Sequence, residues 1–235
     1  MDDQLSDVHE HPSTTEETDP YCLPPDEAAE LLAEAPWKRF GVMGDSLAKG
    51  LGQELPGYRP LSWAARVREA LLTAHPDLSY LNTGHQGLLA AEVRDQQLGP
   101  MLEFQPDLVA MTAGGNDLFG LRFDAGAIEE ALDDIVAKLR GSGADVITYG
   151  LMNITAALPK LAPIRHRLET LNALSLAIAQ RHGTIHVDMW SHPSCGEVNA
   201  YSTDMKHSTM RGHAILGAET IRTMGAWLRQ SGHKR

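Results

Sequence analysis

The chain has 235 residues, of which 43% are hydrophobic and 22% are charged, enough for one well-buried core of ordinary composition. Its formal net charge is -11, and its basic residues are not clustered as they are in proteins that track a phosphate backbone. No apolar run approaches the length of a membrane span, so we expect neither nucleic acid partners nor membrane insertion.

The negative charge lies in the first part of the chain. Residues 1–36 hold eleven Asp or Glu and no Lys or Arg, whereas acidic and basic residues balance in 37–235. An acidic segment with few large apolar residues cannot bury enough surface to offset its ordering entropy, so we predict disorder to about residue 20. Residues 25–32 predict a short capped helix. We expect 1–36 to be a largely disordered extension and 37–235 to be one folded domain.

The N-terminal sequence lacks a positive region followed by an apolar stretch, which is the pattern of a secretory signal. We therefore expect a cytoplasmic location. Cys22 and Cys195 are too few for a disulfide framework, and Cys22 falls in the lead segment, which we expect to be mobile. Both cysteines are expected to be free thiols.

From residue 40 onward, short apolar runs alternate with longer amphipathic stretches. Strands are predicted at 40–43, 79–82, 108–112, 146–149 and 185–189, and helices at 63–74, 89–102, 127–140, 164–182 and 211–228. Strands that alternate with helices need crossover connections, which produce a parallel sheet covered on both faces. The predicted fold class is therefore α/β, a three-layer α/β/α sandwich with a five-stranded parallel sheet. Ligands bind such sheets beyond the carboxyl ends of the strands.

Four motifs follow predicted strands and should meet at that edge. They are Gly44-Asp45-Ser46-Leu47 after the first strand, residues 82–87 after the second, Gly114-Gly115-Asn116-Asp117 after the third and Asp204-Met205-Lys206-His207 after the fifth. Alone, the first motif has a simpler explanation, because Asp and Ser are common helix caps and turn formers. The ordered set of four indicates an acyl-transfer site instead.

Ser46 is the candidate nucleophile of this site. A serine hydroxyl becomes reactive when a nearby base takes its proton, and imidazole has a suitable pKa near neutrality. His207 is the candidate base. Asp204 lies three residues earlier, so its carboxylate can accept a hydrogen bond from one ring nitrogen and leave the other to face Ser46.

Negative charge then develops on the carbonyl oxygen of the substrate, and preorganised donors are needed to stabilise it. The candidate donors are the backbone N–H of Ser46, the backbone N–H of Gly87 and the side-chain amide of Asn116. We expect Asp45, His85 and Gly115 to border the substrate, although a turn histidine without a role explains His85 equally well. Apolar loops at 87–90, 118–123 and 151–162 are expected to hold an acyl chain.

These motifs strongly resemble those of the SGNH hydrolase superfamily, the GDSL esterases and lipases. The resemblance covers residues 38–228, and Gly212-His213 completes its last motif. It implies a flavodoxin-like fold, no metal or organic cofactor, Ser46 as nucleophile, His207 as base and Asp204 as orienting acid. It also implies that Gly87 and Asn116 are oxyanion donors, so 37–235 is expected to be an SGNH hydrolase domain.

Three positions depart from the family pattern. Lys49 replaces a hydroxyl or acidic residue, Ser208 replaces a proline or apolar residue, and Lys206 directly precedes the histidine. We interpret these differences as tuning of the site. Ser46 and Lys49 also fit the Ser-x-x-Lys pattern of penicillin-recognising enzymes, but the Ser-Asp-Asn and Lys-Thr-Gly elements of that class are missing from the sequence.

Other assignments of the polar residues remain open at this point. Asp188 ends the fifth strand and is a rival for the orienting acid, although strand-end aspartates often bond their own loop. His213 could be confused with the base, but its position favours helix packing. His182 and His186 do not share a helical face as a zinc pair would, and Trp63 and Trp190 are better explained by packing than by substrate binding.

The sequence therefore predicts a serine esterase that cleaves a small-molecule acyl ester or thioester through an acyl-enzyme intermediate. An acyltransferase with the same triad is the alternative, in which an alcohol or amine replaces water. A second alternative is a catalytically silent ligand-binding module on the same fold. A flavin-binding module is also conceivable, but it would need a Ser/Thr-rich first loop that this sequence lacks.

Overall fold

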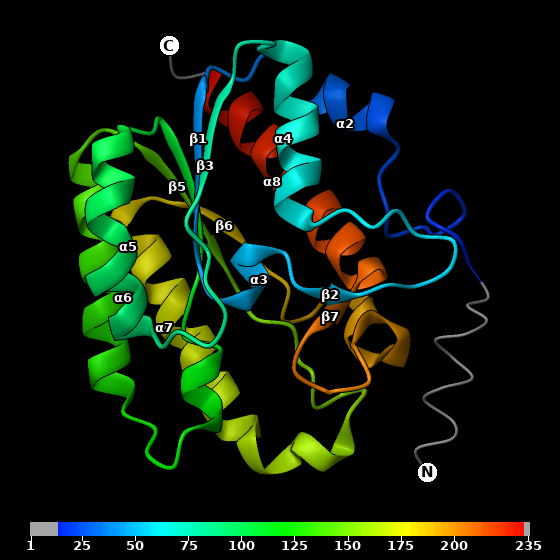
Figure 1. The fold of residues 1–235 in the computed structure, drawn as a ribbon, viewed down its shortest axis with the longest axis vertical. Coiled ribbons are helices and arrows are strands. Elements are labelled where there is room, and N and C mark those ends of the chain that lie inside the picture. The colour runs from blue at the N-terminus through cyan, green and yellow to red at the C-terminus, as the bar shows by residue number, and fades with distance from the viewer. Residues whose placement is uncertain (1–13, 233–235) are drawn as a thin grey trace.

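A five-stranded parallel sheet forms the centre of the protein, whose computed structural model describes residues 14–232 (Figure 1). The strand order is β3-β1-β4-β5-β6. The strands are β1 (Arg39–Gly44), β3 (Ser79–Asn82), β4 (Leu108–Thr112), β5 (Asp145–Tyr149) and β6 (Ile185–Val187). All five predicted strands are confirmed, although the last is two residues shorter than expected. Every residue of β4 is buried, because helices cover both faces of the sheet.

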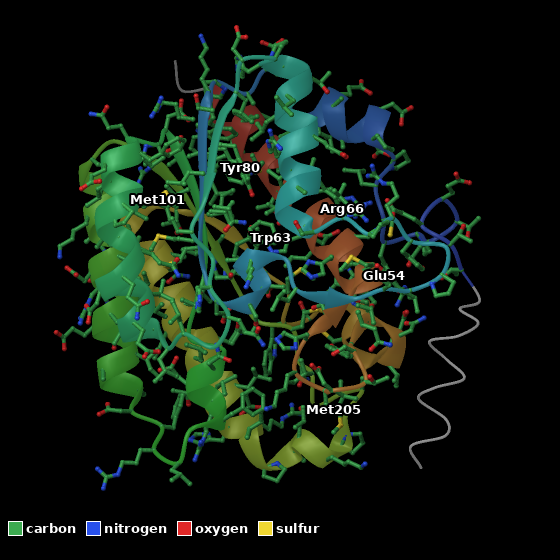
Figure 2. The ribbon with its side chains drawn as sticks, in the orientation of Figure 1. Glu54, Trp63, Arg66, Tyr80, Met101 and Met205 are labelled. Carbon is green, nitrogen blue, oxygen red and sulfur yellow. The ribbon has the colours of Figure 1, made fainter. Side chains whose placement is uncertain are left out.

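Helices form two outer layers (Figure 1). One layer contains α5 (Ala90–Phe104), α6 (Ala125–Gly141) and α7 (Arg165–His182), and the other contains α2 (Pro25–Leu31), α4 (Trp63–Ala74) and α8 (Met210–Gly232). In β1, Phe40 and Val42 pack into the core beneath α4 and α8, whereas Met43 packs toward α5 and α6. Figure 2 shows Trp63 and Met101 in these two separate cores. The predicted three-layer sandwich is confirmed.

Several short elements lie near the carboxyl edge of the sheet and were not predicted. They are α3 (Ser46–Lys49), the parallel pair β2 (Gly52–Gln53) and β7 (Ser208–Thr209), and the 3-10 helices η1 (Asn116–Phe119), η2 (Pro159–Ile164), η3 (Pro193–Gly196) and η4 (Val198–Ala200). Two to six residues are too few to display a hydrophobic period. Tertiary contacts decide these elements.

The predicted disorder to about residue 20 is wrong for residues 14–20, and residues 1–13 lie outside the described part of the chain. Glu16 forms ion pairs with Arg59 and Arg66, and the side chain of Asp19 is fully buried against Arg211. The composition of a segment reflects only how much apolar surface it can bury, and these residues are ordered instead by ion pairs with the folded domain.

Cys22 is buried, in contrast to the mobile position that we expected for it. It packs with Leu55, Tyr58, Met210 and Ala214 in a small cluster beside the N-terminal segment. Cys22 and Cys195 are both free thiols, as predicted.

Candidate active site

The turn after β1 requires glycine at position 44. Gly44 has φ +137°, and a β-carbon there would lie 1.8 Å from the backbone oxygen of Thr112. The buried side chain of Gln97 accepts a hydrogen bond from Gly44 N and donates one to Gly44 O, both at 2.8 Å. The end of β1 is therefore fixed from both sides, and the chain turns sharply out of the sheet at Asp45.

Asp45 and Ser46 begin the short helix α3. Asp45 is its N-cap, and its Oδ1 accepts a hydrogen bond from Leu47 N at 3.0 Å. Ser46 is the first helical residue and is 9% exposed, so its backbone N–H has no partner within the helix. Trp63 Nε1 donates to Leu47 O at 2.8 Å, and Asn82 Nδ2 donates to Ala48 O at 2.8 Å. These contacts fix the helix that carries Ser46.

The loop after β3 lies directly against α3. A β-carbon on Gly84 would lie 2.4 Å from Lys49 N, so this close approach also needs glycine. Gly87 has φ +84°, and a β-carbon there would meet nothing within 4 Å. Gly87 therefore faces open space at the border of the cavity described below.

His207 is paired with Asp204 in the loop before β7. His207 Nδ1 lies 2.6 Å from Asp204 Oδ2, and Asp204 Oδ1 accepts hydrogen bonds from Lys206 N at 2.9 Å and His207 N at 3.0 Å. Burial acts to raise the pKa of Asp204, but hydrogen bonds from Ser202, His207 and the backbone hold this pKa well below its usual range. Asp204 is therefore a carboxylate at neutral pH and selects the tautomer in which Nδ1 of His207 carries a proton.

The β2/β7 pair brings this loop to α3. In this pair, Gly52 of β2 lies opposite Ser208 of β7, the residue directly after His207. Leu51, the residue directly before β2, donates from its N to Ser46 O at 3.0 Å. Ser46 and His207 line the same cavity. Within residues 14–232 no hydrogen bond joins the Ser46 hydroxyl to the His207 ring.

The two further predicted donors also border this cavity. Asn116 Nδ2 donates to Leu88 O at 2.9 Å, and an amide group has a second N–H that remains for a ligand. Asp117 Oδ2 accepts a hydrogen bond from Ala90 N at 3.0 Å and so ties this loop to the start of α5. Gly87, Asn116 and Ser46 all line the cavity.

The cavity has a volume of about 370 Å³. It extends from the polar residues at the sheet edge to apolar side chains of β5, α6, α7 and α8, among them Tyr149, Leu132, Leu168, Leu171 and Leu216. The expected loops contribute Gly87, Leu118, Phe119, Leu151 and Ile154, whereas the contribution of α6 and α7 was not predicted. The site therefore joins a polar end to an apolar chamber.

Asp45 places a second carboxyl group at the polar end. Burial raises its pKa to about 6, and the charge of His207 acts in the opposite direction. Its Oδ2 lies close to Gly115, where a β-carbon would approach to 3.4 Å. Asp45 and Gly115 line the cavity, and their contact with a substrate stays a prediction.

His85 does not lie where we expected it. Its ring is exposed, its Nδ1 is 3.1 Å from Gln86 O, and it does not line the cavity, whereas Gln86 does. The same loop places Gln86 and Gly87 at the cavity instead. His85 therefore does not border this cavity.

The rival residues have other roles. Asp188 Oδ1 accepts a hydrogen bond from Trp190 N at 2.9 Å, in its own loop. His213 is fully buried, with ring nitrogens at 3.3 Å from Trp63 N and 3.0 Å from Leu51 O, and burial lowers its pKa to about 4. Lys49 is exposed and does not line the cavity, which removes the basis of the Ser-x-x-Lys interpretation.

Three residues that hold α3 or the turn before it were not predicted in this role: Asn82 and Trp63, which bond α3, and Gln97, which bonds Gly44. Asn82 lay inside a recognised motif, but its bond to α3 spans 34 residues. Gln97 is a polar residue on the buried face of α5, with 3% of its surface exposed. A polar residue at an apolar position of an amphipathic helix was the available signal.

The described residues contain no helix long and apolar enough to cross a membrane. Among these same residues, no group of three or more His, Cys, Asp or Glu side chains is arranged to hold a metal ion. His182, one of the histidines considered above, instead bonds Asp133 at 2.8 Å.

Comparison with known proteins gives a family and a fold. The sequence model of the GDSL-like Lipase/Acylhydrolase family matches residues 42–215, and no curated protein sequence matches the chain. The acetylxylan esterase Axe2 from Geobacillus stearothermophilus is 19% identical, with a TM-score of 0.66 over 80% of this chain and 94% of that one. LAE5, an alpha/beta hydrolase enzyme from the metagenome of Lake Arreo, Spain, is 19% identical, with a TM-score of 0.66 over 80% and 95%. At these identities the two structures establish the fold. The family match confirms the resemblance found in the motifs, and the chain belongs to the GDSL-like Lipase/Acylhydrolase family of acyl ester hydrolases.

Proposed function

We propose that the protein hydrolyses acyl esters through a covalent intermediate on Ser46. The observation that carries this proposal is the bond of 2.6 Å between His207 Nδ1 and Asp204 Oδ2, with Ser46 and His207 bordering one cavity. A histidine whose Nδ1 donates to a carboxylate presents Nε2 as the base, which is the role required for activating a serine hydroxyl.

The reaction has two steps. Ser46 Oγ attacks the ester carbon, its proton passes to His207 Nε2, and the alcohol leaves with that proton while the acyl group stays on Ser46. Water then attacks the acyl-enzyme, gives its proton to His207, and the carboxylic acid leaves as Ser46 regains its hydrogen. Asp204 remains ionised and stabilises the imidazolium in both steps.

Negative charge on the carbonyl oxygen is stabilised in both steps by the N–H groups of Ser46 and Gly87 and by the free N–H of Asn116. Donors of this kind typically contribute the largest single share of catalysis. The open surroundings of Gly87 and the 9% exposure of Ser46 are compatible with a carbonyl oxygen between them.

The substrate is a small ester with an apolar acyl group. The apolar chamber beyond Asn116 supports this, because it belongs to a cavity whose whole volume of about 370 Å³ lies at the small end of sites for organic ligands. A short acyl group such as acetyl, which the name of Axe2 indicates for that enzyme, would leave most of the chamber empty.

A fluorophosphonate probe tests the nucleophile. We expect the wild-type protein to be labelled and Ser46→Ala to remain unlabelled. Ser194→Ala is the matched control, because Ser194 is buried and hydrogen-bonded to His192 away from the cavity. Equal labelling of wild type and Ser46→Ala would refute the assignment.

Rates on a chain-length series of nitrophenyl esters then test the substrate class. We expect kcat/KM to rise from acetyl to a medium-length acyl group and to fall again once the chain exceeds the chamber. A series in which acetyl is the best substrate would refute the apolar acyl site and favour acetylated alcohols. Decay of the trapped acyl-enzyme with and without added alcohols separates hydrolysis from acyl transfer.

A further inference from the structure

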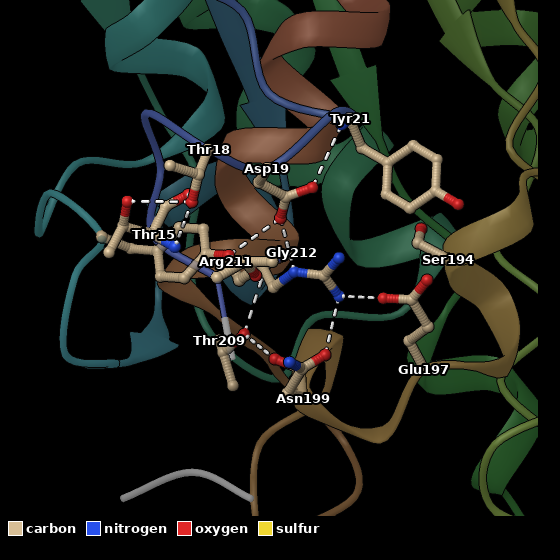
Figure 3. A network of polar contacts seen from close by, with 12 residues as sticks. Thr15, Thr18, Asp19, Tyr21, Ser194, Glu197, Asn199, Thr209, Arg211 and Gly212 are labelled. Carbon is tan, nitrogen blue, oxygen red and sulfur yellow. Dashed lines mark hydrogen bonds and ion pairs between the residues drawn. The ribbon is translucent and has the colours of Figure 1, made fainter. Parts of the chain in front are cut away.

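The N-terminal segment 14–24, here called the N-terminal strap, lies outside the family match, which begins at residue 42. It crosses the side of the molecule where α8 begins, and Figure 3 shows its polar contacts. Tyr21 O and Cys22 O accept hydrogen bonds from Arg222 at 3.1 and 2.9 Å. The strap is therefore fixed to the body of the domain along its length.

Two carboxylates of the strap are anchored in different places. Glu16 is bound by Arg59 and Arg66, and both of these residues belong to α4 or the loop before it. Asp19 Oδ2 accepts hydrogen bonds from Arg211 Nε at 2.6 Å and from Tyr58 OH at 2.8 Å. The side chains of Asp19 and Arg211 are 0% and 3% exposed, so this ion pair is fully enclosed.

Arg211 continues this contact toward the loop of His207. Its guanidinium donates to Asn199 Oδ1 at 2.7 Å and lies 2.6 Å from Glu197 Oε2. Asn199 O accepts a hydrogen bond from Thr209 Oγ1 at 2.6 Å (Figure 3). Thr209 is fully buried and lies two residues after His207, so a short series of bonds leads from the strap to the histidine loop.

The opposite side of the same loop is held by β2. Thr203 N donates to Gln53 Oε1 at 2.8 Å, and Ser202 N donates to His207 O at 2.9 Å. The loop is thus held between β2, which follows the helix of Ser46, and Arg211. Loss of either support would change where the His207 ring stands relative to Ser46.

We propose that Asp19 is a positioning residue for catalysis: through Arg211, the N-terminal strap fixes the loop that presents His207 to Ser46. This inference rests on the proposed function for its kinetic consequences. Without the Asp19 charge, Glu197 is the one ion-pair partner left to the enclosed Arg211 among residues 14–232, and its side chain is 40% exposed. The guanidinium then turns toward Glu197 and releases Asn199, which loosens the support of Thr209.

The test compares Asp19→Asn with Glu16→Gln in the full-length protein. Each substitution neutralises one carboxylate of the N-terminal strap that forms ion pairs with arginine, so both should lower Tm. We expect only Asp19→Asn to lower kcat, by about tenfold, with KM nearly unchanged, because small displacements of a catalytic group reduce the rate steeply. Wild-type kcat in Asp19→Asn, or an equal loss in Glu16→Gln, would overturn the proposal.

Proton NMR gives a readout that does not depend on turnover. The proton between His207 Nδ1 and Asp204 is assigned by its disappearance in Asp204→Asn. We expect Asp19→Asn to shift or broaden this resonance and Glu16→Gln to leave it unchanged. An unchanged resonance in Asp19→Asn overturns the positioning role even if the protein hydrolyses no ester, whereas an inactive wild type would refute only the proposed function.

Arg211→Lys provides the second variant. It keeps the buried positive charge but replaces the rigid guanidinium fork by a single nitrogen on a flexible chain, so the geometry that joins Asp19 to Asn199 is lost. We expect the same loss of kcat and the same change of the His207 resonance. Wild-type values for both in Arg211→Lys would overturn the proposal, whatever the stability of Asp19→Asn.

Discussion

Replacing Asp45 by Asn is expected to stabilise the protein above neutral pH and to slow ester hydrolysis. The carboxyl group is 7% exposed, its Oδ1 accepts one hydrogen bond from Leu47 N, and burial raises its pKa to about 6. Asparagine has nearly the same shape and can accept the same bond. The substitution therefore removes mainly the cost of ionising a buried group.

The magnitude follows from the pKa. Because the folded-state pKa lies above the ordinary value of 3.8 for this carboxyl group, the folded protein binds the extra proton, and stability falls as the pH rises from about 4 through about 6. A rise of this size corresponds to about 3 kcal/mol at full ionisation. For a chain of this length, that is about 6 to 12 °C in Tm. The advantage of Asp45→Asn should be small at about pH 4 and complete at about pH 8.

Activity should change in the opposite direction. The Asp45 carboxylate attracts the charge of His207, so it favours the imidazolium that forms when Ser46 is deprotonated. We expect kcat of Asp45→Asn at about pH 8 to fall several-fold while Tm rises.

Thermal unfolding of wild type and Asp45→Asn across this pH range measures the difference in stability, and ester hydrolysis measures kcat. Asp188→Asn is the control, because its carboxylate also accepts a backbone N–H in a loop and no similar gain in Tm is expected. A Tm difference that does not grow with pH, or a less stable Asp45→Asn at about pH 8, would refute the reasoning.

Three further predictions concern the same site. Asp204→Asn should lower kcat by about 10⁴. Because the pKa of Asp204 is depressed, the loss of stability in this variant should appear above about pH 4 and vanish in acid. An equal loss of Tm above about pH 4 and in acid would contradict this. Asn116→Ala should reduce kcat by about 10² to 10³, so burst kinetics with an unchanged acylation rate would argue against an oxyanion donor. Gly87→Ala should fold, but its free energy of unfolding should fall by about 1 to 2 kcal/mol, because φ +84° disfavours a side chain. An unchanged free energy of unfolding in denaturant would contradict this reasoning and show that the loop adapts.

The main elements could be predicted from local patterns. Residues 63–74 and 79–82 form a helix and a strand with the predicted bounds, because their apolar spacing is set within each segment. The alternation of such elements also predicted the parallel sheet. Since the carboxyl ends of parallel strands meet at one edge, the assembly of Ser46, Asn116 and His207 around one cavity followed from order along the chain.

The positions within the site could not be predicted in this way. His85 was expected to border the substrate because it lies in a motif, yet its ring is exposed and does not line the cavity. The pairing of β2 with β7 joins residues about 150 positions apart through two-residue strands, which carry no periodic signal. Their meeting depends on how α3 and α8 pack.

By itself, the sequence determined the α/β architecture, the family and the order of the motif residues, because hydrophobic period and motif spacing are properties of short segments. Only the tertiary structure decided which residues hold the motifs in place. Gln97 fastens Gly44 from 53 residues away, and Asp19 meets Arg211 across 192 residues. Such contacts depend on distances in the folded chain and on burial that strengthens polar interactions, so an acidic segment that appears disordered in the sequence is an ordered part of the domain from residue 14 onward.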